Sequence, residues 1–108
     1  MKKEYLANFC IAGFTYYEGV SVFRKIKIGK KLILKLEEEN KYDPKAVAIY
    51  YKDSKIGFIP RNENRIFYKL IKIGLSNLIE IRVQQKDASA YPEEQIRLDA
   101  YLINKNSM

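Results

Sequence analysis

The chain has 108 residues, the length of one small domain, and its hydrophobic fraction of 47% is enough to build one compact core. Its 20 Lys and Arg residues outnumber its 13 Asp and Glu residues, and the net charge of +7 favours nucleic acid as a partner, although such a charge can also simply keep a small protein in solution. A single cysteine and the absence of histidine exclude an intrachain disulfide and the usual Cys/His zinc site. No apolar stretch is long enough to span a membrane, and the N-terminus runs directly into a strand-like pattern, so we expect a cytoplasmic protein with no membrane partner.

The N-terminal third is predicted to form a long strand followed by a basic stretch. Residues 5–17 are rich in aromatic and apolar side chains, and Gly13 indicates a bend or bulge within them. Cys10 lies in this apolar run, so we expect a buried thiol that carries no chemistry. After a turn at residues 18–19, residues 24–35 contain basic side chains and no acid, and a Gly-Lys pair at 29–30 divides the stretch into two elements.

Five further strands and one helix are predicted in the rest of the chain. Apolar runs and alternating patterns place the strands at residues 31–36, 46–51, 56–59, 78–85 and 95–103. Apolar residues at helical spacing between Ile66 and Ile73 predict a helix that Gly74 ends. Short strands at close intervals favour a mainly β domain with one helix (α+β), a small, partly open β-barrel of the OB or SH3 type with about six strands. One domain is expected over residues 1–108, with its core at about 5–103 and a tail at 104–108.

The sequence offers little for catalysis. Without histidine, Ser-His-Asp and Cys-His arrangements are excluded, and Gly29-Lys30 lacks the flanking residues of a nucleotide-binding P-loop. A magnesium nuclease would have to use the acids that flank two strands, which are Glu37, Glu38, Glu39, Asp43 and Asp53. Consecutive strand residues point to opposite faces, so the three glutamates cannot converge on one ion, and a solvated charge cluster is the simpler interpretation. We therefore expect no enzyme activity, no cofactor and no metal.

Three short motifs in a fixed order carry a resemblance to a known family. Residues 13–17 read GFTYY, residues 40–47 read NKYDPKAV and residues 55–61 read KIGFIPR. Together they resemble the HIRAN family, and the likeness extends over residues 7–103. In that family the module is best known at the head of large helicase-like DNA translocases, where it resembles an OB-type barrel and captures the free 3′-hydroxyl end of single-stranded DNA. The resemblance implies a module standing alone, as in bacterial members, whose hydrolase labels would belong to the motors of larger relatives.

The resemblance also assigns DNA-binding roles to particular residues. Tyr16 and Tyr42 match aromatic residues that stack on the terminal bases, an interaction that tolerates any base. Asp43 matches the carboxylate that accepts a hydrogen bond from the 3′-hydroxyl, and Asn40 matches a neighbouring polar contact. Arg61 falls where the family has a basic residue near the backbone phosphates. Arg61 could equally be a solvated cation, although the start of a helix disfavours positive charge and so hints at a bound anion.

The same residues have structural alternatives, and the sequence departs from the family at two of the motifs. Tyr16 and Tyr42 could fill the barrel core, and Asp43 could fix a turn by bonding its own backbone. Thr15 stands where the end-binding eukaryotic members carry arginine, and Phe58 replaces a polar residue beside the glycine. These changes put phosphate affinity and selectivity for the 3′ end in question.

Three functions remain open at this point. The leading one is a non-catalytic module that binds single-stranded DNA or 3′-hydroxyl DNA ends, with DNA repair or recombination proteins as further partners. The alternative is a protein-interaction module that recruits a separately encoded helicase, nuclease or mobile-element factor, since so small a chain shows no catalytic set. An enzyme that needs magnesium and Asp43 comes last.

Overall fold

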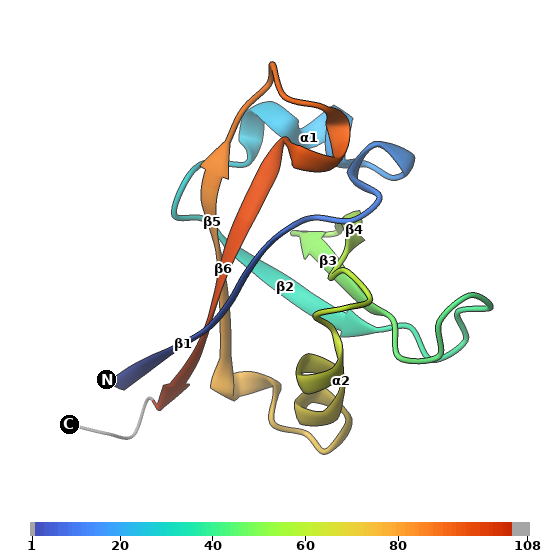
Figure 1. Cartoon of the computed structure of the whole chain (residues 1–108), viewed down its shortest axis with the longest axis vertical. Helices are drawn as coiled ribbons and strands as arrows, with labels where there is room; N and C mark the ends of the chain where they lie inside the picture. The colour runs from blue at the N-terminus through green and yellow to red at the C-terminus, as the bar shows by residue number, and fades with distance from the viewer. Residues whose placement is uncertain (1, 105–108) are drawn as a thin grey trace.

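The computed structural model describes residues 2–104, which form a six-stranded antiparallel sheet flanked by short helices (Figure 1). The strands are β1 (Lys2–Cys10), β2 (Lys31–Leu36), β3 (Val47–Tyr51), β4 (Ser54–Phe58), β5 (Ile79–Lys86) and β6 (Ile96–Asn104). The α-helices are α1 (Gly19–Val22) and α2 (Arg65–Lys72), and the 3₁₀ turns are η1 (Phe14–Tyr16), η2 (Phe23–Lys25), η3 (Ser76–Leu78) and η4 (Pro92–Glu94). The predicted mainly β class is confirmed.

The sheet curls until its two edge strands nearly meet. Its strand order is β1-β6-β5-β2-β3-β4, and each neighbouring pair is antiparallel. Just after β1, Ala12 exchanges two backbone hydrogen bonds of 2.9 Å with Phe58 of β4. Within residues 2–104 this isolated bridge joins the edge strands, so the barrel is partly open, as predicted.

Gly57 permits the close approach at this bridge. A Cβ atom on Gly57 would lie 2.4 Å from Cγ2 of Ile11 and 2.5 Å from the carbonyl oxygen of Ala12. Its φ of +147° is also one that residues with side chains rarely adopt. The glycine of the third motif therefore serves the closure of the barrel.

The core fills the inside of this curled sheet, and α2 covers one end of it (Figure 1). Alternate residues of the strands point inward, among them Ile49, Ile81 and Leu98, which are almost fully buried. Phe67 of α2 is fully buried and packs edge-to-face against Phe9 of β1, with ring centroids 5.9 Å apart. Helix α2 is thereby fixed to the strands, and so is the segment before it, which approaches the β2–β3 loop.

One buried carboxylate, Glu80 of β5, ties three cations together across the sheet. Its side chain is 3% exposed and lies 2.6 Å from Nζ of Lys3, 3.2 Å from Nζ of Lys31 and 3.3 Å from Nε of Arg82. Burial raises the pKa of Glu80, but the hydrogen bonds from Lys3, Arg82 and Lys31 outweigh it and hold the pKa at about 2. Strands β1, β2 and β5 are linked through this one acid.

Three expectations about the N-terminal part are wrong. The predicted strand over residues 5–17 ends at Cys10, because Gly13 adopts a left-handed φ of 70° and turns the chain into η1. Cys10 is half-buried rather than buried, since the inward positions of this segment belong to Phe9 and Ile11 on either side of it. A second helix, α1, follows where only a turn at residues 18–19 was expected.

The remaining elements lie close to their predicted positions. Helix α2 begins one residue before the predicted Ile66, and Gly74 follows its end with a left-handed φ of 86°. Asn104 belongs to β6, and the rest of the predicted tail, residues 105–108, lies outside the described residues. Among residues 2–104 there is no helix with the length and apolar character needed to cross a membrane.

Candidate nucleic-acid interface

Asn40 shapes the loop between β2 and β3. Its Oδ1 atom accepts hydrogen bonds from the backbone N–H groups of Tyr42 at 2.9 Å and Asp43 at 3.0 Å. Its Nδ2 atom donates to Oε1 of Glu37 at 3.3 Å, and its backbone N–H donates to the Glu37 carbonyl. Asparagine is suited to such a turn because its short amide can replace backbone hydrogen bonds. Asn40 therefore sets the positions of Tyr42 and Asp43.

Hydrogen bonds hold both carboxylate oxygens of Asp43, and part of the side chain stays exposed. Its Oδ1 atom accepts from the backbone N–H of Lys45 at 2.9 Å, which is the predicted turn role. Its Oδ2 atom accepts from Nδ2 of Asn64 at 2.9 Å. Its side chain is 21% exposed, and an ionised carboxylate offers about four acceptor sites. Asp43 thus fixes the turn and keeps acceptor capacity toward solvent.

Arg61 lies beside this carboxylate. Its Nη2 atom donates to the backbone carbonyl of Tyr42, and its Nε atom is 3.8 Å from Oδ2 of Asp43. The arginine side chain is 69% exposed, so most of its fork of donors faces solvent. The cation before α2 has its partners within the protein, so its position near a helix start does not by itself indicate a bound anion.

These residues line one hollow of about 250 Å³. Asn40, Tyr42 and Asp43 come from the β2–β3 loop, and Arg61 comes from the segment before α2. The rest of the wall is formed by Ala12, Tyr17, Ala46, Phe58 and Ile59. The hollow therefore lies where the closing bridge of the barrel meets the β2–β3 loop, and four of the five predicted site residues converge there.

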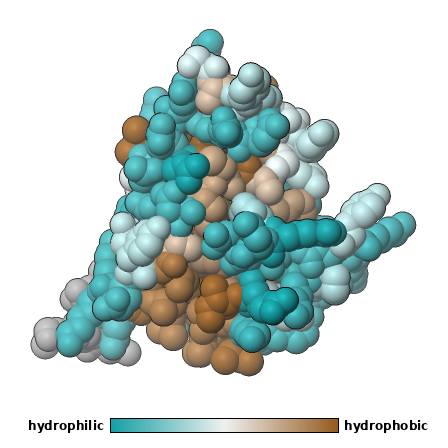
Figure 2. Space-filling view, viewed as in Figure 1, coloured by the Kyte–Doolittle hydropathy of each residue, from teal (hydrophilic) through white to brown (hydrophobic). Residues whose placement is uncertain are grey.

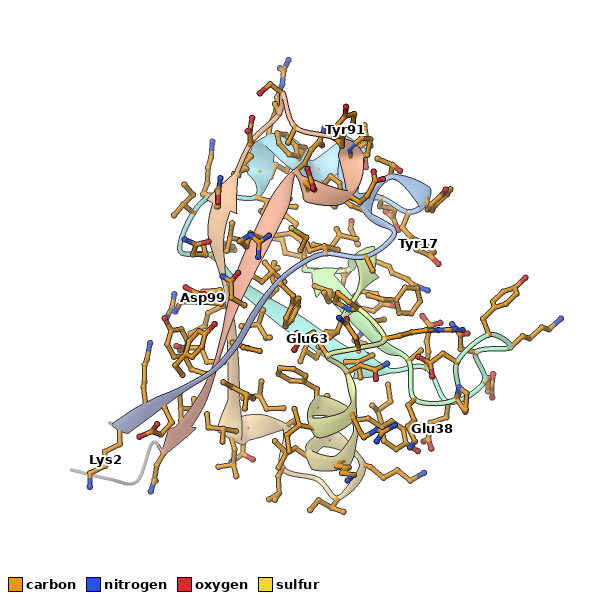
Figure 3. The ribbon with its side chains drawn as sticks, in the orientation of Figure 1. Lys2, Tyr17, Glu38, Glu63, Tyr91 and Asp99 are labelled. Carbon is orange, nitrogen blue, oxygen red and sulfur yellow. The ribbon has the colours of Figure 1, made fainter. Side chains whose placement is uncertain are left out.

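An aromatic pair forms one wall of the hollow. The rings of Tyr17 and Phe58 pack edge-to-face with centroids 5.4 Å apart. Nζ of Lys55 lies 4.4 Å from the Tyr17 centroid and 4.3 Å from the Phe58 centroid, and it also pairs with the Glu37 carboxylate. Figure 3 places Tyr17 on the side of the molecule from which the β2–β3 loop projects. Phe58 therefore adds a ring to the hollow.

The two predicted stacking tyrosines are both exposed but lie in different places. Tyr42 is 84% exposed and Tyr16 is 85% exposed, so neither is a core residue, and the core-packing alternative is wrong. Tyr42 lines the hollow with Asp43. Tyr16 instead lines a separate hollow of about 320 Å³ with Thr15 and residues of η4. The structure therefore does not bring Tyr16 and Asp43 to the same hollow.

Sequence reasoning missed two residues of this site. Tyr17 follows Tyr16 directly, and only the 3₁₀ geometry of η1 decides which of the adjacent rings reaches the hollow. Asn64 is 4% exposed and immediately precedes α2, where asparagine usually indicates a helix cap. Its Nδ2 atom instead bonds Asp43 and, at 3.1 Å, the carbonyl of Lys45. Asn64 holds Asp43 at the wall of the hollow.

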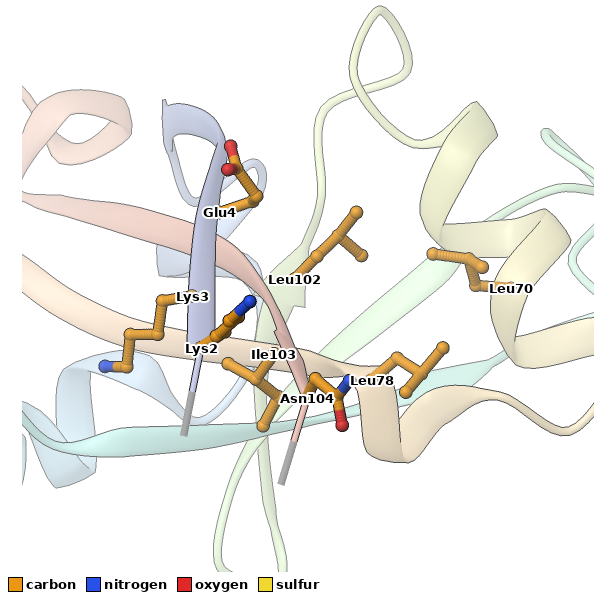
Figure 4. Close-up of a pocket in the computed structure, with 8 residues that line it drawn as sticks. All are labelled: Lys2, Lys3, Glu4, Leu70, Leu78, Leu102, Ile103 and Asn104. Atoms are coloured by element: carbon orange, nitrogen blue, oxygen red, sulfur yellow. The ribbon is translucent and has the colours of Figure 1, made fainter. Parts of the chain in front are cut away.

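A larger hollow of about 390 Å³ lies at another end of the molecule (Figure 4). Leu70, Leu78, Leu102 and Ile103 contribute to its lining, together with the first residues of β1. Figure 2 shows apolar surface gathered at the lower end of this face, where α2 and η3 lie. No cluster of rings and hydrogen-bonding groups comparable with that around Asp43 lines this hollow, so it is the weaker candidate for nucleic acid.

The glutamates that follow β2 form ion pairs with different lysines. Glu37 pairs with Lys55, and Glu38 pairs with Lys72 of α2, which raises the pKa of that lysine through the hydrogen bond and the charge of Glu38. Among residues 2–104 no group of three or more acids or cysteines is placed to hold a metal ion. The candidate site is therefore the hollow with its rings, carboxylate and arginine.

A family model described as HIRAN domain matches residues 5–102. None of the curated proteins compared with the chain matches it. The crystal structure of a protein from Lactobacillus plantarum is similar with a TM-score of 0.76 at 20% identity, over 94% of this chain and 95% of that one. The crystal structure of the HIRAN domain of human HLTF gives a TM-score of 0.69 at 15% identity, over 93% of this chain and 78% of that one. These two structures support the fold, and because the family match spans nearly the whole sequence, the chain belongs to the HIRAN domain family.

Proposed function

We propose that the hollow beside the β2–β3 loop captures the 3′-hydroxyl end of single-stranded DNA. The chain belongs to the HIRAN domain family, which is known as a family of DNA-binding modules. The main support for binding of a 3′ end is that a fixed carboxylate, Asp43, and an exposed ring, Tyr42, line the same hollow. A reducing cytoplasm is the compartment we propose for a chain with a single cysteine.

Asp43 gives the site its preference for a hydroxyl. A terminal 3′-hydroxyl can donate to the outward lone pairs of the carboxylate, and hydrogen bonds to ionised groups are about twice as strong as neutral ones. A 3′-phosphate would bring a second negative charge against Asp43, and like charges at such distances repel. Asn64 and Asn40 hold the carboxylate in place before DNA arrives, so little ordering is needed on binding.

Tyr42, Tyr17 and Arg61 supply the rest of the binding surface. Exposed rings suit sequence-independent binding because every base has a π-face, and stacking contributes about 1–3 kcal/mol per base. The hollow of about 250 Å³ is smaller than the roughly 300–1,000 Å³ of most ligand pockets, which suits a strand end rather than a whole ligand. The outward donors of Arg61 can bind the phosphate next to the terminal residue.

Fluorescence anisotropy with labelled oligonucleotides tests the proposal. A strand that ends in a 3′-hydroxyl is expected to bind more tightly than the same strand with a 3′-phosphate. Equal affinities for the two ends contradict end recognition and leave only general DNA binding. If neither strand binds at low salt, DNA binding by this chain is wrong, and a stable protein partner recovered by co-purification then supports the protein-interaction alternative.

A further inference from the structure

Four lysines form a basic patch away from the hollow, at the turn between η2 and β2. The patch consists of Lys27, Lys30, Lys52 and Lys86. Backbone hydrogen bonds from Lys30 to the Lys27 carbonyl, and between Val83 of β5 and residues 29–30, hold this turn against β5 (Figure 1). Lys86 is the last residue of β5, and Lys52 lies in the β3–β4 hairpin turn.

Three of the four patch lysines lie on aromatic rings. Nζ of Lys30 and Nζ of Lys52 each lie 5.6 Å from the ring centroid of Tyr51, which is 7% exposed. Nζ of Lys86 lies 4.5 Å from the ring centroid of Phe23. Cation–π contacts of this kind restrain long side chains, so less entropy is lost when a ligand binds them. Lys30 and Lys52 therefore share the buried ring of Tyr51, and Lys86 lies on the ring of Phe23.

The patch lacks the neutralising acids that accompany other cations of this protein. Glu80 neutralises three cations of the sheet, Glu37 pairs with Lys55 and Asp43 pairs with Arg61. Among residues 2–104 no carboxylate forms an ion pair with any of the four patch lysines.

The acid that follows Lys86 in the chain is engaged elsewhere, and the charge of another lysine lies near Lys86. Asp87 is the acid next to Lys86 in the chain, and its carboxylate instead accepts the hydroxyl of Ser89 at 2.7 Å and the Ser89 N–H at 2.9 Å. Burial lowers the pKa of Lys86, and the nearby charge of Lys27 lowers it further. Cations crowded in this way favour a polyanion that relieves the repulsion.

We propose that this patch binds the backbone phosphates of the DNA strand whose 3′ end occupies the hollow. The inference rests on the proposed function. Strand β4 connects the two places, since it begins just after Lys52 and ends at Phe58, which lines the hollow. Five strand residues extend about 13 Å, which corresponds to on the order of four stacked nucleotides at about 3.4 Å each. The patch therefore meets the strand a few nucleotides before its end.

Binding measured against strand length and salt tests this inference. Wild-type protein is expected to bind a 3′-hydroxyl strand of about ten nucleotides more tightly than one of about two, because only the longer strand reaches the patch. Two double variants, Lys30→Gln with Lys52→Gln and Lys27→Gln with Lys86→Gln, should each weaken binding of the long strand by roughly two- to thirtyfold, the range for two exposed ion pairs. Each should also reduce the salt slope by about 0.7 for every phosphate that the variant no longer binds.

A control with the same change of charge separates this patch from the overall charge. Lys2→Gln with Lys69→Gln removes two exposed lysines from β1 and α2, and Figure 3 shows Lys2 at the lower end of the molecule. The control should keep both affinity and salt slope closer to wild type. Patch variants that bind the long strand with wild-type affinity and slope overturn the inference, as does a control that is weakened as much. If the short strand binds but lengthening it adds nothing, the patch proposal falls and end capture stands; if neither strand binds, both fall.

Discussion

Replacing Tyr42 with alanine should weaken DNA binding strongly while leaving the fold almost unchanged. The side chain is 84% exposed, so its removal creates no cavity, and surface changes of this kind stay within about 0.5 kcal/mol of unfolding free energy. The loop keeps its shape because Tyr42 is held within it by its backbone N–H and carbonyl, which are bonded to Asn40 and Arg61. Loss of one stacking ring costs about 1–3 kcal/mol of binding, which corresponds to roughly a 5- to 150-fold higher Kd.

Anisotropy titrations with a short 3′-hydroxyl strand, together with chemical unfolding of each variant, measure both effects. Tyr42→Phe keeps the ring and should bind like wild type. Tyr5→Ala is the matched control, because Tyr5 is 60% exposed but lies on β1, paired edge-to-face with Tyr101 and away from the hollow. A Tyr42→Ala variant that binds like wild type, or a Tyr5→Ala variant whose affinity falls as far, refutes the stacking role.

Three further predictions concern stability and the support of the site. Gly57→Ala should lower the unfolding free energy by about 1–3 kcal/mol more than Gly74→Ala does, as measured by urea titration. Both glycines have a positive φ, but only at Gly57 would a Cβ atom meet neighbouring atoms. The cations around Glu80 lower its pKa from 4.5 to about 2. The ionised Glu80 therefore contributes its full stabilisation above about pH 4.5, and this contribution is lost as the pH falls toward 2. Unfolding measured between these pH values should therefore show a steeper loss for wild type than for Glu80→Gln, and parallel curves would refute this. Asn64→Ala removes a hydrogen bond to the Asp43 carboxylate and should lower the unfolding free energy by about 1–3 kcal/mol. It should also weaken DNA binding, because Asp43 is then held less firmly. Unfolding and anisotropy measure the two effects, and unchanged values for both contradict the positioning role.

Much of the barrel could be predicted because its strands carry local patterns. Apolar alternation located β2, β3, β5 and β6 to within a residue or two, and helical spacing with Gly74 located α2. The N-terminal part could not be predicted in the same way. Its apolar run continues through Phe14, which is buried by η1 and not by a strand, so composition alone does not show where the strand ends. The bridge between Ala12 and Phe58 joins segments that are far apart in the sequence.

The candidate site likewise has a part that local sequence predicts and a part that depends on tertiary structure. Asn40, Tyr42 and Asp43 are close in the sequence, and the turn chemistry of Asn and Asp already indicates a shaped loop. Tyr17 and Asn64 enter the site only through tertiary structure, one by the rotation of η1 and the other by the approach of α2 to the loop. Sequence could therefore name the loop, but not the ring and the amide that complete it.

Selection of a 3′-hydroxyl end by Asp43 is tested by the ratio of the Kd values for 3′-phosphate and 3′-hydroxyl strands, measured in wild type and in Asp43→Asn. A ratio taken within one variant cancels any loss of folded protein, which matters because the new amide would face the Asn64 amide. Wild type should favour the hydroxyl strand, and Asp43→Asn should bring the ratio close to one, because a neutral amide does not repel the phosphate. A ratio that stays the same after the substitution contradicts the claim.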